Sequence, residues 1–137
     1  MMERKDIEIM APAGSRESLM AALKNGADSV YFGIGQLNMR AASSVNFTAG
    51  DLKDIVSICR DYGKKSYLTV NVVVYDDEIS QMHEIVDTAV ASGVSAIIAS
   101  DLSVINYAFS SGAEVHLSTQ LNISNAGSLK FYSQWAD

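Results

Sequence analysis

The chain has 137 residues, of which 48% are hydrophobic and 19% charged, the balance expected of one soluble domain with a core. Its 10 basic and 16 acidic residues give a net charge of −6, which disfavours nucleic acid unless a local basic patch or a missing segment supplies cations. No apolar run approaches the ~20 residues that span a bilayer, and the single cysteine cannot form an internal disulfide, so we expect a cytoplasmic protein with no membrane segment.

Five short apolar runs recur along the chain. They cover residues 7–11, 29–34, 66–74, 95–100 and 114–120. A glycine precedes four of them, at Gly26, Gly63, Gly93 and Gly112, as expected where a helix ends and a strand begins. The runs are largely continuous rather than alternating, which indicates parallel strands covered on both faces.

Segments with helical periodicity separate these runs. The segment from Leu52 to Tyr62 places its apolar residues on one face, after a Thr48…Asp51 pair with capping-box spacing. The segment after Asp76 repeats this pattern, with acidic residues in its first turn, where the helix dipole favours anions. A fourth helical pattern begins at Asp101, and residues 124–137 have the pattern of a fifth helix.

Five strand–helix units predict an α/β fold of the TIM-barrel type, in which residues 1–137 form the first five βα units of a parallel barrel. A complete eight-unit barrel usually needs about 250 residues, so we expect a partial barrel that ends before the sixth strand. The alternative is a complete five-stranded, doubly wound sheet of the flavodoxin-like kind. Both folds place the functional face at the carboxyl ends of the strands.

Polar residues gather at those strand ends. Asn71 lies in the third run, Asp101 follows the fourth, and His116, Ser118 and Gln120 alternate along the fifth, so that the last three share one side of a strand. Buried polar groups need partners, and we therefore predict a hydrogen-bonding site. The alternatives are a polar plug that satisfies itself or a row of residues near solvent and, for Asp101, a helix N-cap.

A long connection follows the second run. Residues 35–47 exceed the usual 2–6 residues of a βα connection, a property typical of functional loops. Arg40 is its only charge, flanked by Asn38 and Asn46, and it either grips a phosphate or carboxylate or fastens the loop to the body. The adjacent "GIGQLN" lacks the third glycine of a dinucleotide fingerprint and does not predict such a site.

Familiar catalytic arrangements are not visible in the sequence. His116 and Ser118 lie two positions apart on a strand, roughly 6–7 Å, too far for a preformed nucleophile–base pair. Cys59 lies in an apolar helical stripe and is expected to be inert core, and one cysteine alone cannot ligate zinc or an iron–sulfur cluster. His83 lacks the second histidine of a zinc-protease helix and is expected to be structural.

Five ordered motifs resemble one known family. They are APAGSRESLMAALKNGADSVYFG, LNMRAASSVNFT, YLTVN, IIASDLSVI and VHLSTQLNISN. In this order and spacing they resemble the N-terminal half of the collagenase-like peptidases of unknown catalytic class, peptidase family U32, over almost the whole chain. The resemblance implies a (βα)-barrel enzyme domain of bacteria and archaea.

The resemblance also implies site residues and cofactors. Motif by motif, the family's recurrent positions correspond to Asn38, Arg40, Asn46, Asn71, Asp101, His116, Ser118, Thr119, Gln120 and Asn125. Of these we predict that Asn38, Arg40, Asn71, Asp101, His116, Ser118, Gln120 and Asn125 bind substrate. The family's Gly-Cys…Gly-Cys-type segment would come after Asp137, so we expect no cofactor in this segment, an iron–sulfur cluster only in the full-length protein, and no activity from the segment alone.

Three functional hypotheses follow. The family is named for proteolysis, yet its better understood branches support hydroxylation of a tRNA or ribosomal RNA base or of the ubiquinone ring, and hydroxylation is our main prediction for the parent protein. The first alternative is peptide hydrolysis, as in a collagenase-like protease. The second is a non-catalytic binding or assembly module, because a five-stranded piece leaves two sheet edges that favour self-association.

Overall fold

The structure, a computed structural model, describes residues 1–39, 41 and 47–136, so Arg40 and Asn46 lie outside the described residues. Its centre is one parallel sheet of five strands in the order β1-β2-β3-β4-β5. The strands are β1 (Met10–Pro12), β2 (Ser29–Phe32), β3 (Lys65–Val70), β4 (Ala96–Ala99) and β5 (Val115–Leu117). Each strand pairs with the next in sequence, as in a barrel wall, whereas a flavodoxin-like sheet places the first strand between the second and third. The predicted α/β fold is confirmed, and the doubly wound alternative is wrong.

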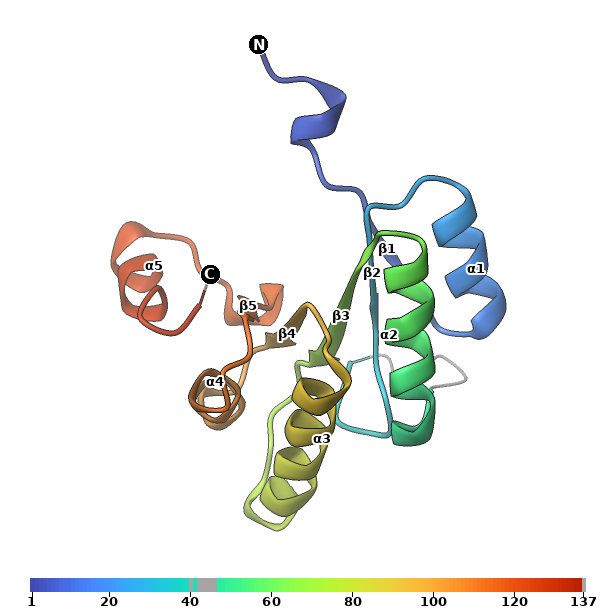
Figure 1. Ribbon diagram of the computed structural model, residues 1–137. Helices are drawn as coiled ribbons and strands as arrows, with labels where there is room; N and C mark the ends of the chain where they lie inside the picture. Colours follow the sequence, from blue (N-terminus) through green and yellow to red (C-terminus); the bar gives the residue numbers. More distant parts are fainter. Residues whose placement is uncertain (40, 42–46, 137) are drawn as a thin grey trace.

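Helices connect the strands and follow one side of the curved sheet. They are α1 (Arg16–Lys24), α2 (Leu52–Asp61), α3 (Ile79–Ser92), α4 (Leu102–Ser110) and α5 (Ala126–Tyr132). Short 3₁₀ turns lie at η1 (Arg4–Asp6), η2 (Ala49–Asp51), η3 (Asp76–Glu78) and η4 (Thr119–Leu121). Figure 1 shows α1 to α4 following the sheet as it curves from β1 towards β5. Within the described residues, no helix has the length and apolar character that crossing a bilayer requires.

Local sequence signals account for the ends of several elements. Gly93 ends α3 with φ of 79°, a left-handed conformation that glycine adopts without steric cost, and the other three predicted glycines also have positive φ. At the start of α2, the Thr48 N–H donates to Asp51 Oδ2 over 2.8 Å, which confirms the capping box.

The two faces of the sheet have different compositions. On the helix-covered face, Val30, Phe32, Leu68 and Ile97 are fully buried and belong to the single apolar core. The opposite, concave face presents the intervening residues, so that Thr69, Ile98 and His116 lie side by side on β3, β4 and β5. The core therefore lies between sheet and helices, and the more polar side chains lie on the concave face.

All five strands are shorter than the predicted apolar runs, and β3 and β5 differ most. The run at 66–74 leaves the sheet after Val70, and the Val74 N–H donates to Asp101 Oδ2 (3.1 Å) instead of to a strand. The run at 114–120 ends as a strand at Leu117, and η4 follows, with Asn122 in the left-handed region at φ 49°. β1 lies at residues 10–12 instead of 7–11, and α5 covers only part of the predicted 124–137.

Candidate functional site

A cavity of about 600 Å³ opens on the concave face of the sheet. Its lining comes from β1 to β5 and from the segments that follow β2, β3 and β5: Met10, Tyr31, Met39, Thr69, Asn71, Ile98, His116, Leu117, Ser118, Thr119 and Gln120. The volume falls in the range of small-molecule and substrate sites. Four of the predicted site residues, Asn71, His116, Ser118 and Gln120, line this one cavity.

Three side chains form a hydrogen-bonded group at the mouth of this cavity. Asn71 Nδ2 donates to Ser118 Oγ and to Gln120 Oε1, each over 3.4 Å, and Ser118 Oγ also donates to Gln120 Oε1. Asn71 Oδ1 accepts from the Met39 N–H at 3.2 Å, which links the group to the long connection after β2. These three side chains therefore satisfy part of one another's hydrogen-bonding groups, as expected for a polar plug. Gln120 nevertheless remains exposed to solvent.

His116 lies at the centre of β5 and forms a pair with Glu114. His116 Nε2 is 2.7 Å from Glu114 Oε1, and the ring packs edge-on against Tyr67 with centroids 4.9 Å apart. A carboxylate only accepts, so Nε2 carries the proton in this pair, and Nδ1 is the basic nitrogen of the neutral ring. Ser118 bonds to Asn71 and Gln120 and not to His116, in agreement with the absence of a preformed nucleophile–base pair.

A second polar layer lies nearer the amino ends of the strands, and sequence reasoning missed it. The Tyr67 hydroxyl donates to Glu8 Oε1 (2.6 Å), and Lys65 Nζ donates to Glu8 Oε2 (3.1 Å). The Tyr67 hydrogen bond lowers the pKa of Glu8 in spite of partial burial, whereas burial and then Glu8 raise the pKa of Tyr67. Alternation along β3 places Tyr67 on the same side as Thr69, but only the pairing of the strands brings Glu8 to it.

Asp101, at the start of α4, accepts hydrogen bonds from two backbone N–H groups and one hydroxyl. Oδ1 accepts from the Ser103 N–H (2.8 Å) and hydroxyl (2.6 Å), and Oδ2 accepts from the Val74 N–H. Burial raises the pKa of this carboxyl, but the hydrogen bonds from Ser103 and Val74 outweigh burial and lower it. Asp101 is therefore an N-cap, as one alternative expected, although it also lines a cavity of about 500 Å³ with Asn71 and Gln120.

Two further predicted residues support the backbone. Asn38 is 2% exposed, and its Nδ2 donates to the carbonyls of Ile34 and Gly35 over 3.3 Å each. It fills the space beside Gly33, where an added Cβ would lie 2.3 Å from Asn38 Cγ. Asn125 caps α5 by accepting from the Ser128 N–H (2.9 Å) and is exposed. Substrate binding by either stays a prediction.

Neither Cys59 nor His83 contributes to the concave face. Cys59 is fully buried in α2, and burial raises the pKa of its thiol to about 11. His83 on α3 stacks against Tyr107 of α4, with centroids 3.8 Å apart. In the part of the chain that the structure describes, no group of three histidine, cysteine or acidic side chains could hold a metal ion. The described residues, with one buried cysteine, do not provide the ligands of an iron–sulfur cluster. Such a cluster therefore stays a prediction for the full-length protein.

Acidic residues concentrate at the carboxyl edge of the sheet, which we define as the side where β1 to β4 end and α1 to α4 begin. They are Glu17, Asp51, Asp54, Asp76, Asp77, Glu78 and Asp101. In the same turns the described basic residues are Arg16, which bonds to Asp54 at 2.5 Å, and Lys53. Helix N-termini favour anions, so these acids stabilise their helices.

Comparison with known proteins gives a family match over most of the chain. The profile of peptidase family U32 matches residues 14–136. A collagenase of Porphyromonas gingivalis is 62% identical over 136 residues, which cover 99% of this chain and 33% of that protein. A tRNA hydroxylation protein of Bacillus subtilis is 30% identical over 132 residues, which cover 95% of this chain and 31% of that protein. The chain therefore spans about a third of the length of these curated relatives.

A solved structure of a U32 peptidase is similar in fold. It superposes with a TM-score of 0.72 at 13% identity, over 94% of this chain and 55% of that one. At this identity the likeness concerns the fold alone.

Proposed function

The chain belongs to peptidase family U32, and from this membership we propose that the full-length protein hydrolyses peptide bonds of a polypeptide bound along the concave face. The observation that carries the proposal is the 62% identity, over 99% of the chain, to a protein named collagenase. The sequence identity to the tRNA hydroxylation protein of Bacillus subtilis is lower, at 30%. These values favour peptide hydrolysis over hydroxylation, the reverse of the ranking that we predicted from the sequence.

The electrostatics of the carboxyl edge support a polypeptide substrate. RNA carries one negative charge per phosphate, and binding it depends on basic groups that neutralise those charges. Among the described residues of the carboxyl edge, seven are acidic and two are basic: Arg16, which is paired with Asp54, and Lys53. A peptide chain carries no such backbone charge, and its C=O groups are complementary to the N–H donors of the exposed Gln120 amide, whereas Asn71 and Ser118 are already hydrogen-bonded to each other and to Gln120.

Within this proposal, His116 acts as a general base. Its Nδ1 takes a proton from water while the water oxygen attacks the carbonyl carbon of the substrate peptide bond. The C–N bond then breaks, and the same proton passes from the imidazolium to the leaving nitrogen. Glu114 accepts the Nε2–H at 2.7 Å, so it orients the ring and stabilises its positive charge.

The proposal is tested with full-length protein and denatured collagen. We expect gelatin to be cleaved, and we expect the rate at which new amino termini form to increase linearly with enzyme concentration. Nucleosides of tRNA and rRNA from a strain lacking the gene are weighed by mass spectrometry in parallel. Intact gelatin together with a hydroxyl group missing from one RNA nucleoside would contradict peptide hydrolysis.

Hydroxylation of an RNA base is the second candidate, favoured by the 30% identity to a tRNA hydroxylation protein. On this alternative tRNA or rRNA is the partner, and basic residues outside the described part of the chain must bind its phosphates. Deletion of the gene would then remove one hydroxyl group from a tRNA or rRNA nucleoside. Hydroxylation of a quinone ring predicts unchanged RNA and an altered quinone mass.

A further inference from the structure

A buried tyrosine lies against the ring of His116 on the concave face. Tyr67 on β3 is 2% exposed, and its ring packs edge-on against the imidazole, with centroids 4.9 Å apart and an interplanar angle of 63°. Aromatic rings favour this edge-to-face arrangement at centroid distances of about 4.5–7 Å. The general base of the proposed reaction therefore has a second neighbour besides Glu114.

The pairing of the strands explains how Tyr67 reaches His116 across an intervening strand. Tyr67 pairs with Ala96 of β4, and His116 pairs with Ile98 of the same strand. Neighbouring strands lie about 4.8 Å apart, so β3 and β5 are separated by roughly 10 Å. The two rings must therefore lean towards each other over β4, where Ala96 occupies little space. The short side chain of Ala96 allows this contact.

The hydroxyl of Tyr67 is fixed near the amino ends of the strands. It donates to Glu8 Oε1 over 2.6 Å, and the other carboxylate oxygen, Oε2, accepts from Lys65 Nζ over 3.1 Å. The hydrogen bond from Tyr67 is the main cause that lowers the pKa of Glu8 below its ordinary value of 4.5, so the acceptor is a carboxylate near neutral pH. A hydroxyl bonded to a carboxylate at this distance makes a short, charge-assisted hydrogen bond. Tyr67 is therefore fixed at its backbone by β3 and at its far end by Glu8.

Glu114 orients His116 but cannot fix the plane of its ring. Its side chain is 51% exposed, and it bonds to one ring nitrogen, Nε2, over 2.7 Å. Interactions between exposed side chains contribute little, because water screens them and the side chains lose rotational freedom. A bond to one ring atom also fixes the direction of that atom and not the plane of the ring. Contact with the buried and tethered Tyr67 supplies the second restraint.

We infer that Tyr67 is a positioning residue for His116, and that Glu8 keeps Tyr67 in place. Tyr67 holds the plane of the imidazole so that Nε2 stays on Glu114 and Nδ1 stays available to the attacking water. Neither Tyr67 nor Glu8 exchanges a proton with the substrate. The inference rests on the proposed peptide hydrolysis, because it takes His116 as the general base.

The test uses the full-length protein carrying Tyr67→Phe, which keeps the ring and removes the hydroxyl. A small displacement of a catalytic group can cost about 100-fold in rate, so we expect kcat for a gelatin-derived peptide to fall roughly 10- to 100-fold. KM should stay at the wild-type value, because neither Tyr67 nor Glu8 is among the described residues that line the cavity on the concave face. A wild-type kcat, or a loss that comes from KM alone, would overturn the inference.

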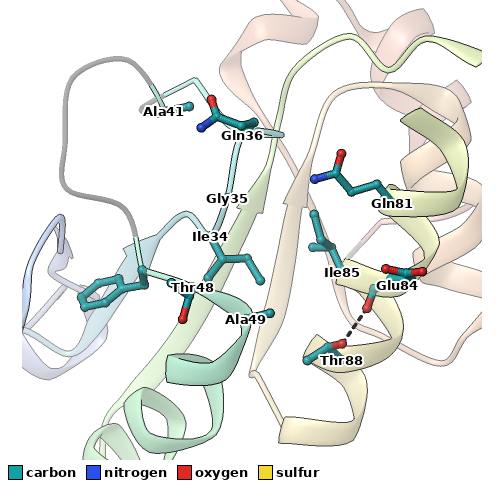
Figure 2. Close-up of a pocket in the computed structure, with 11 residues that line it drawn as sticks. Ile34, Gly35, Gln36, Ala41, Thr48, Ala49, Gln81, Glu84, Ile85 and Thr88 are labelled. Atoms are coloured by element: carbon teal, nitrogen blue, oxygen red, sulfur yellow. Dashed lines mark hydrogen bonds between the residues drawn. The ribbon is translucent and has the colours of Figure 1, made fainter. Parts of the chain in front are cut away.

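A matched control lies on the helix-covered side of the sheet. Tyr107 on α4 stacks against the other histidine, His83 of α3, with centroids 3.8 Å apart, and its hydroxyl donates to Asp87 over 3.1 Å. Figure 2 shows α3 on this side, with the side chains of its Ile85 and of Ile34, which follows β2, facing each other. Tyr107→Phe removes the same kind of hydrogen bond next to a histidine and is expected to leave kcat and KM unchanged. An equal loss of kcat in both variants would contradict the positioning role.

Glu8→Ala provides an independent route to the same effect. The Glu8 side chain is 37% exposed, so we expect the variant to fold, and its unfolding free energy is measured alongside. Because Glu8 acts through the hydroxyl of Tyr67, its loss of kcat should match that of Tyr67→Phe, and the double variant should show no further loss. Losses that multiply in the double variant would show that the two residues act separately and would reject the inference.

Magnetic resonance of the histidine rings separates this inference from the proposed function. Full-length protein is isotopically labelled in histidine alone, and the His116 signals are those absent from His116→Ala. In the wild type, the ring nitrogen shifts are expected to report one tautomer with the proton on Nε2, whereas Tyr67→Phe and Glu8→Ala should each give a mixture of tautomers on a mobile ring. This expectation holds even if the wild-type protein cleaves nothing. A mixture in the wild type, or wild-type spectra in both variants, would reject the positioning role.

Discussion

On the helix-covered face of the sheet, Val30, Phe32 and Leu68 are buried and apolar, whereas neighbouring positions on the concave face hold Tyr67, Thr69 and His116. Both faces are built by the same five strands, and adjacent residues of a strand alternate between them. Burial of the first set supplies the hydrophobic stabilisation of the fold. Polar groups on the concave face add little to this hydrophobic stabilisation, so the fold does not depend on them and they can serve binding or catalysis.

The largest effect on stability is expected on the helix-covered face. Leu68→Ala in the central strand removes a fully buried side chain and is expected to cost about 2–5 kcal/mol of the free energy of unfolding. Urea denaturation followed by circular dichroism measures it. Ile98→Ala on the concave face is the matched variant, and its loss should be smaller because Ile98 is only partly buried. Equal losses would contradict the division between the two faces.

A smaller effect is expected at Asp101, which joins α4 to the segment that follows β3. Asp101→Ala removes the acceptor for Ser103 and Val74 and should cost about 1–2 kcal/mol, in the upper range for a lost N-cap. Thermal denaturation gives this value. If instead stability is retained while gelatin cleavage is lost, Asp101 binds substrate, as the sequence predicted.

The Asp101 contribution should also depend on pH. The folded-state pKa lies below the ordinary value of 3.8, so the carboxylate stabilises the fold fully above that value. The stabilisation is lost as pH falls through the lower, folded pKa. The difference in unfolding free energy between wild type and Asp101→Asn should therefore be constant near neutrality and shrink below about pH 4. A difference that grows on acidification would have the wrong sign.

The smallest effect is expected at Asn125, which caps a short, exposed helix. Asn125→Ala should cost about 0.5–1 kcal/mol and leave gelatin cleavage unchanged. Denaturation and the cleavage assay on the same preparation check both statements. Loss of cleavage with normal stability would instead support the predicted binding role of Asn125.

Sequence reasoning succeeded where one local signal decides the structure. Gly93 ends α3, Thr48 and Asp51 form a capping box, and the apolar stripe of α2 buries Cys59. It was less accurate for β5, because a strand period cannot foresee the 3₁₀ turn after Ser118. Gln120 reaches Ser118 and Asn71 through that turn and not through strand alternation.

Side-chain partners of the predicted site were the harder part to foresee. Asn38 and Asn125 belong to family motifs, yet their hydrogen bonds join backbone groups a few residues away. Glu8 and Tyr67 meet across 59 positions in the sequence, which no local pattern encodes. The pairing register of the sheet was needed to bring them together.

The two histidines of the chain provide the most direct test, since His116 lies on the concave face and His83 on the helix-covered side. The rate of gelatin cleavage by the full-length protein is measured for His116→Ala and His83→Ala, with the unfolding free energy of each. The account predicts that His116→Ala lowers kcat by roughly 10²–10⁴-fold at nearly wild-type stability, while His83→Ala keeps its activity. Equal activity of the two variants, or a loss confined to His83→Ala, would contradict it.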